Sequence, residues 1–191
     1  MKFAINTRVM NLVLLETVIP NLVVELAYAS PANFVGRAVY PPTARAYLLE
    51  GTALRLLAAS QALERHQLRL KVLDAYRPRP VQEIFWALMP DPRYVANPLD
   101  GSRHSRGASV DVTLIDHLGR ELPMPSQFDD FSERAHRNYT ACAGECLENR
   151  RLLQEAMAQA GFLPLETEWW HFDDPEWNQH PLLDITFEAL A

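Results

Sequence analysis

The stretch Ser102-Arg103-His104-Ser105-Arg106-Gly107-Ala108-Ser109-Val110-Asp111 sets a histidine and a carboxylate seven residues apart, with a glycine between them. A strand over residues 108–114 would alternate its faces, so Val110 and Val112 enter the core while Asp111 lies beside Ser109 on the other face. Gly107 permits the sharp turn that brings the loop containing His104 back over Asp111. This arrangement predicts a metal site. A catalytic zinc needs three protein ligands and one open position, so a third ligand must come from elsewhere.

The segment Glu168-Trp169-Trp170-His171-Phe172 is the best source of that ligand, and its aromatic content favours a strand. Strict alternation would put Glu168 and His171 on opposite faces, so a bend or the strand's twist must turn both toward one metal. His171 would then complete a set of two histidines and one aspartate, and Glu168 could take a proton from water at the open position. The alternative is a buried aromatic strand with a hydrogen-bonded histidine and an exposed glutamate.

These motifs resemble a known family when they are combined with an upstream segment. The pattern SxHxxGxxxD, then ExWH, together with Asp74-Ala75-Tyr76-Arg77-Pro78, is similar to the zinc D-alanyl-D-alanine dipeptidases, which include the enzyme of vancomycin-resistance operons. The resemblance extends from about residue 28 to about residue 187. One departure is visible, because this chain has Ala108-Ser109 where the family usually has Ser-Ala. Both residues are small, so we expect the packing beside the metal to survive.

The resemblance also implies roles for residues outside the metal set. Arg77 lies between a strand end and a proline-locked turn, which favours a rigid arginine. It matches the family arginine that stabilises the oxyanion of the tetrahedral intermediate; the alternative is a salt bridge to Asp74 or Glu83. Asp129 matches the carboxylate that recognises the substrate's free amino group, with Asp130 as the alternative register and both open to being ordinary loop residues. Tyr28 and Ser102 are the remaining substrate-binding residues that we predict, although Tyr28 could pack on the core and Ser102 could cap its loop.

Composition limits the class of protein. The 191 residues fit one domain, residues 1–191, and the formal net charge of -6 argues against nucleic acid as a partner. Residues 9–26 are largely apolar, but their polar residues interrupt any signal-peptide or membrane-spanning segment. We therefore expect strand and turn there, no membrane partner, and a cytoplasmic rather than periplasmic protein. Cys142 and Cys146 would lie on one face of a helix, as a reduced pair.

The order of expected elements predicts an α+β domain with a largely antiparallel central sheet and helices mostly on one side. The resembled family has such a hedgehog/DD-peptidase-like fold. Helices are expected up to about residue 66, over 81–89 and over 145–160, and a half-buried strand over 68–74. A last strand could span 183–187.

We therefore predict a dipeptidase with one Zn²⁺ per chain, held by His104, Asp111 and His171, and a small-molecule substrate, the D-Ala-D-Ala dipeptide. Glu168 and Arg77 would be its catalytic residues. The alternatives are a zinc D,D- or L,D-carboxypeptidase acting on peptidoglycan peptides, or a non-catalytic zinc-binding module of the same fold. The oligomeric state does not follow from the sequence.

Overall fold

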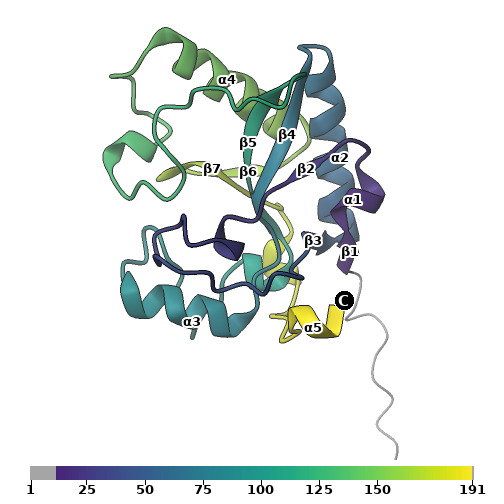
Figure 1. Ribbon diagram of the computed structural model, residues 1–191, viewed down its shortest axis with the longest axis vertical. Helices are drawn as coiled ribbons and strands as arrows, with labels where there is room; N and C mark the ends of the chain where they lie inside the picture. Colours follow the sequence, from purple (N-terminus) through teal and green to yellow (C-terminus); the bar gives the residue numbers. More distant parts are fainter. Residues whose placement is uncertain (1–11, 191) are drawn as a thin grey trace, which may run out of the picture.

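The computed structural model describes residues 12–190, and a five-stranded sheet runs through the centre of this part of the chain (Figure 1). The strand order in that sheet is β2-β4-β5-β7-β6, and a second sheet pairs β1 with β3. The expectation for residues 9–11 lies outside the described residues. The strands are β1 (Leu12–Leu14), β2 (Val23–Val24), β3 (Tyr47–Leu49), β4 (Leu68–Asp74), β5 (Ser109–Asp116), β6 (Leu163–Leu165) and β7 (Glu168–Asp173).

The central sheet is largely antiparallel. β4 pairs with β5, β5 with β7 and β7 with β6 in antiparallel register, whereas β2 runs parallel to β4. Val110, Val112 and Leu114 of β5 point into the core and are fully buried, as the alternation in the sequence predicted. The predicted α+β architecture is therefore confirmed.

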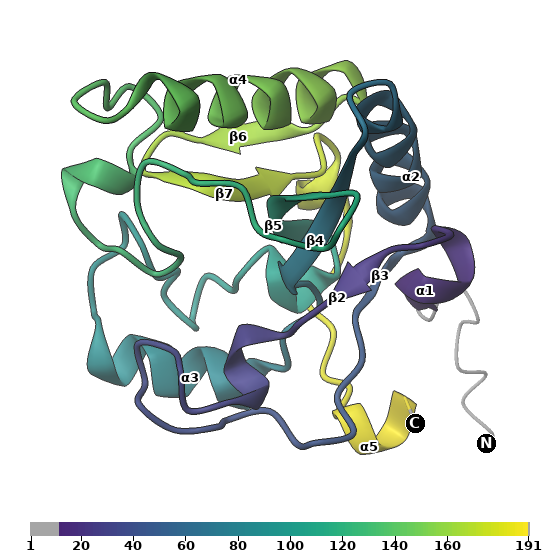
Figure 2. The ribbon, with the colours of Figure 1, turned by 45° about the horizontal axis from the view of Figure 1, so that its top comes forward.

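Two long helices cover one face of this sheet (Figure 2). Leu56 and Leu63 of α2, with Leu153 and Met157 of α4, are buried in the same core cluster as the apolar face of β5. A third helix, α3, lies on the opposite side of the sheet (Figure 2). No helix within residues 12–190 has both the length and the apolar character needed to cross a bilayer. The helices are α1 (Leu15–Val18), α2 (Glu50–Glu64), α3 (Arg79–Leu88), α4 (Gly144–Gln159) and α5 (Phe187–Leu190), with short 3-10 helices η2 (Ala27–Ala29), η3 (His104–Arg106), η4 (Glu133–Ala135) and η5 (Trp177–Gln179).

The prediction of a half-buried β4 is wrong. The last five residues of this strand, positions 70–74, are all buried, so side chains on both of its faces are covered. Lys71 is one of these buried residues, and its ammonium group forms salt bridges with Glu25 and Glu121. Alternating charge therefore marked a buried cation with two exposed partners, not a solvated face.

The predicted last strand over residues 183–187 is also wrong. Its backbone is bonded to side chains and loops and not to a neighbouring strand: the Leu183 N–H donates to the Ser105 carbonyl at 2.8 Å, and the Tyr76 hydroxyl donates to the Ile185 carbonyl at 2.8 Å. The chain then enters α5 at Phe187. A buried tyrosine hydroxyl thus satisfies polar groups that a strand partner would otherwise bond.

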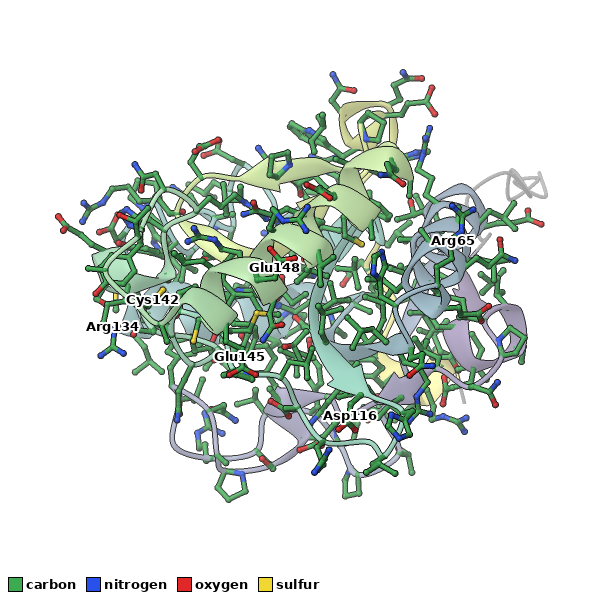
Figure 3. The ribbon with its side chains drawn as sticks, turned by 90° about the horizontal axis from the view of Figure 1, so that it is seen from above. Arg65, Asp116, Arg134, Cys142, Glu145 and Glu148 are labelled. Carbon is green, nitrogen blue, oxygen red and sulfur yellow. The ribbon has the colours of Figure 1, made fainter. Side chains whose placement is uncertain are left out.

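The two cysteines do not share a helix face. α4 begins at Gly144, so Cys142 precedes the helix while Cys146 lies in its first turn. Both are free and partly buried. Figure 3 shows Cys142 ahead of the helix, with Glu145 and Glu148 along α4. The sulfur atoms are therefore not presented as a pair by one regular helix.

Candidate metal centre and active site

The loop between α3 and β5 positions His104 as the sequence predicted. Gly107 has a φ of +67°, which favours glycine, and a Cβ atom there would also crowd Leu12 Cδ2 at 2.7 Å and Leu49 N at 3.3 Å. His104 is buried in η3, and its Nδ1 lies 2.7 Å from the Ala75 carbonyl oxygen. Because that carbonyl accepts a hydrogen bond from Nδ1, the Nε2 atom is left to bind a metal.

Asp111 and His171 are cross-strand neighbours. The β5–β7 pairing sets them directly opposite each other, which places both side chains on the same face of the sheet. His171 Nδ1 lies 2.9 Å from Asp111 Oδ1 and 3.2 Å from His104 Nε2, and the distance from His104 Nε2 to Asp111 Oδ1 is 3.4 Å. All three residues are buried. Ligands about 2.05 Å from a tetrahedral zinc stand about 3.3 Å apart, so the three atoms fit one such ion.

Glu168 reaches the same site because β7 is not regular. Pro164 pairs with Phe172, but the next residue of β6, Leu165, pairs with Glu168, so the register breaks within this hairpin. Glu168 Oε2 consequently lies 3.9 Å from His171 Nδ1, although strict alternation would put the two side chains on opposite faces. Glu168 is buried, which contradicts the alternative of an exposed glutamate.

Asp173 orients His171 from behind. The Nε2–H group of His171 donates to Asp173 Oδ1 at 2.9 Å, which aims Nδ1 at Asp111 and His104. Asp173 Oδ2 in turn accepts a hydrogen bond from Arg103 Nη1. A carboxylate bonded to the second nitrogen of a metal-binding histidine is a common support of metal sites. Asp173 was not predicted from the sequence, although its spacing of two residues from His171 on a strand was a signal that the two side chains share a face.

Arg77 is buried beside the candidate ligands and held from two directions. Its Nε and Nη2 atoms donate to Asp74 Oδ2 at 2.9 and 2.7 Å, and Nη1 donates to Gln82 Oε1 at 2.7 Å. The Nη2 atom lies 3.9 Å from Asp111 Oδ2. The salt bridge to Asp74 that the sequence allowed is therefore present, and it coexists with a position next to the metal set. Gln82 was missed because nothing in its spacing on α3 distinguishes it from a surface residue.

A cavity of about 260 Å³ joins these groups to the residues expected to bind substrate. The Tyr28 hydroxyl donates to Asp129 Oδ1 at 3.0 Å. Asp129 Oδ2 is shielded from solvent and has no hydrogen-bond partner among the described residues, and the residue has a φ of +60°. Asp130, the alternative register, accepts the Ser132 N–H and does not line the cavity. Ser102 lines the cavity and also caps its loop, because its Oγ accepts the His104 N–H at 3.2 Å.

The pKa values of the site are shifted because several carboxylates are buried close together. Burial raises the pKa of Glu168 to about 8 and that of Asp129 to about 7. Burial alone would lower the pKa of His171, but Asp173 and Asp111 outweigh it and raise that pKa to about 10. The two neighbouring histidines hold the pKa of Asp111 well below its usual range despite its burial. A cation placed among these groups would offset their mutual repulsion.

A buried set of two histidines and one aspartate, with a glutamate beside it in a small cavity, is the arrangement of a metal-dependent hydrolase. A family model described as D-ala-D-ala dipeptidase matches residues 8–188. The D-alanyl-D-alanine dipeptidase of Escherichia coli K12 is 40% identical over 180 residues, covering 94% of this chain and 92% of that protein. The D-alanyl-D-alanine dipeptidase of Enterococcus faecium is 30% identical over 181 residues, covering 80% of this chain and 87% of that protein. The chain belongs to the D-Ala-D-Ala dipeptidase family of metallopeptidases.

Proposed function

We propose that this metallopeptidase is a zinc enzyme that hydrolyses the D-alanyl-D-alanine dipeptide, and that residues 1–191 form one domain dedicated to it. The observation that carries the proposal is the convergence of His104 Nε2, Asp111 Oδ1 and His171 Nδ1 on one point, with Glu168 beside it. Relatives named D-alanyl-D-alanine dipeptidase support the choice of substrate.

The donor set suits zinc. Two imidazole nitrogens and one carboxylate oxygen are ligands that zinc accepts, and three protein ligands leave its fourth position open, as in catalytic zinc sites. His104 and His171 would each bind through one nitrogen while the other donates to Ala75 O or to Asp173. Zinc held there would acidify a water molecule and polarise the carbonyl group of the scissile peptide bond.

Glu168 and Arg77 are the proposed catalytic residues. Glu168 takes a proton from the attacking water through its carboxylate and returns it to the nitrogen of the leaving D-alanine. Arg77 donates a hydrogen bond to the scissile carbonyl oxygen as negative charge develops on it. Because Asp74 and Gln82 already fix the guanidinium, little reorganisation is needed when that charge appears.

Asp129 would recognise the substrate's amino group. Its Oδ2 lies at the cavity with no partner of its own, and an ammonium group would supply the missing donors. Tyr28 holds the other carboxylate oxygen, so it positions Asp129 as well as lining the cavity. Ser102 would close the metal loop and contribute its side chain to the cavity wall. A substrate without a free amine would leave Asp129 buried and unpaired, which favours dipeptides over acylated peptides.

The test is hydrolysis by the zinc-loaded protein of free D-Ala-D-Ala beside an N-acylated peptide that ends in D-Ala-D-Ala. We expect cleavage of the free dipeptide alone. Cleavage of the acylated peptide would move the protein to the carboxypeptidases that act on peptidoglycan peptides. Failure to cleave either one would contradict the proposed substrate.

The metal assignment has a separate test that does not depend on turnover. His171→Ala removes one of the three proposed ligands. We therefore expect elemental analysis of the purified variant to find much less than one zinc ion per chain. His136→Ala is the matched control, because His136 bonds to Tyr94 and does not line the cavity. Full zinc occupancy in His171→Ala would mean that the third ligand lies elsewhere.

A further inference from the structure

The proposed substrate has a charge at each end, and the proposed function assigns a partner to only one of them. Asp129 takes the ammonium group, so the C-terminal carboxylate still needs a cation or a set of donors. Arginine is well suited to a carboxylate because its planar guanidinium offers several N–H donors in a fixed fork. Within residues 12–190, the arginines that line the cavity are Arg77, Arg93 and Arg103.

Two of these arginines are committed elsewhere. Arg77 uses three of its N–H groups on Asp74 and Gln82, and it stands beside Asp111, where the scissile carbonyl is expected. Arg93 forms several hydrogen bonds to the carboxylate of Asp91, and its side chain is 69% exposed, so its charge is both paired and screened by water.

Arg103 differs from both. Its side chain is 36% exposed at the cavity wall, and its guanidinium carbon lies 4.6 Å from the centre of the Trp177 ring. Its Nη1 donates to Asp173, which uses one of the five N–H donors that a guanidinium has. The stacking and the ion pair fix the group in place, so little side-chain entropy remains to be lost when a ligand binds.

The position of Arg103 relative to the metal ligands also suits this role. Asp173 joins Arg103 to the Nε2 side of His171, whereas the metal-facing Nδ1 is on the other side of that ring. Asp129 lies on the metal-facing side, because it accepts a hydrogen bond from Tyr28, whose ring is 5.4 Å from the guanidinium carbon of Arg77. Trp177 also lies 5.8 Å from the guanidinium of Arg106, whose hydrogen bonds go to the carbonyls of His180 and Asp100. Among the described residues, Trp177 therefore has Arg103 and Arg106 beside it, and the buried carboxylate bonded to Arg103 is that of Asp173. The neighbouring buried carboxylate, Asp174, instead contacts Thr52 and Arg55. Asp100 is an exposed residue, so water screens its charge.

We propose that Arg103 binds the C-terminal carboxylate of the substrate and is a specificity-determining residue. This inference rests on the proposed function. With Asp129 at the amino end and Arg103 at the carboxyl end, the site would recognise both termini of one small molecule. A peptide extended at its C-terminus would place an uncharged peptide group at Arg103. Longer peptides would therefore bind less well, because Asp129 and Arg103 each require a charged terminus.

The experiment compares D-Ala-D-Ala with its C-terminal amide, D-Ala-D-Ala-NH₂, which keeps the scissile bond and the free amine. Wild type should prefer the acid. For Arg103→Gln we expect kcat/KM on the acid to fall by about 10- to 100-fold, mostly through KM, as for loss of a hydrogen bond to a charged group. Activity of this variant on the amide should stay within about twofold of wild type. Arg103→Lys, which keeps the charge but not the fork, should recover part of the loss.

Arg93→Gln is the matched control, because it removes a guanidinium from the wall of the same cavity; both substrates should be cleaved as by wild type. Zinc affinity is measured in parallel by competition with a chelator. Equal losses on acid and amide, together with weaker zinc binding, would overturn the inference and restrict Arg103 to supporting Asp173. Unchanged activity on the acid would also overturn it while leaving the proposed function intact. If wild type cleaves neither compound, the proposed function and the inference both fail.

Discussion

Replacing Asp129 by asparagine should make the protein more stable at neutral and alkaline pH, although it removes the group that we propose binds the substrate amine. Burial raises the pKa of Asp129 from the ordinary value of 3.8 to about 7. The folded state therefore holds this proton more tightly than the unfolded state, and wild-type stability falls as the pH rises between those two values. The asparagine variant has no proton to lose there.

The magnitude follows from the size of the change in pKa. At about 1.4 kcal/mol per pH unit, this difference in pKa lowers wild-type stability by about 4 kcal/mol at pH 8 but by only about 1.7 kcal/mol at pH 5, relative to low pH where Asp129 is protonated in both states. The stability difference between Asp129→Asn and wild type should therefore grow by about 2.5 kcal/mol from pH 5 to pH 8. In a chain of 191 residues, that corresponds to a change of about 5–10 °C in the difference between their melting temperatures.

The assay is urea unfolding followed by circular dichroism at pH 5, 6, 7 and 8, with a chelator present, because a bound dication would lower the pKa of nearby carboxyl groups. Asp130→Asn removes a charge from the same loop outside the cavity and is the matched control. A difference between Asp129→Asn and wild type that is the same at pH 5 and pH 8 would refute the reasoning. The carboxylate would then be solvated, and the amine site would need another residue.

Three further changes test other parts of the site. Glu168→Gln should lower kcat by about 10²- to 10⁴-fold while zinc content stays stoichiometric, because it removes a proton acceptor but no ligand; loss of zinc as well would make Glu168 a ligand. Asp173→Asn should weaken zinc binding by about 10- to 100-fold in chelator competition, because His171 loses its carboxylate partner; an unchanged affinity would show that the strand alone orients the imidazole. Ser109→Ala should raise the free energy of unfolding by about 1 kcal/mol, since the buried Ser109 Oγ has no partner among the described residues; destabilisation in urea unfolding would instead reveal a hydrogen bond to water.

The strand that contains Asp111 was predictable because its alternation of apolar and polar residues and the glycine before it indicate the same local structure. Val110 and Val112 alternate with Ser109 and Asp111, and Gly107 marks the turn before them. Each of these signals is local. In the structure, both valines are buried and Gly107 has a positive φ. The pairing of His104 with this strand was expected from the same turn.

Features that depend on pairing between distant segments could not be obtained this way. The register break opposite Pro164 and Leu165 brings Glu168 to the side of His171, and nothing in the period of β7 reveals it. The hydrogen bonds of Tyr76 to the segment before α5 join residues 109 positions apart, so the apolar pattern there resembled a strand. Lys71 looked solvated because its partners, Glu25 and Glu121, are far away in sequence.

The cross-strand pair of Asp111 and His171 has a consequence for how this protein could change. Two of the proposed ligands belong to central strands, where amide hydrogens should exchange only when much of the molecule opens. Asp129 and Arg103, by contrast, lie in irregular segments outside the sheet. Substitutions in such segments are tolerated more readily than in the elements that they connect. Substrate preference could therefore drift over generations while the centre that cleaves the bond stays the same.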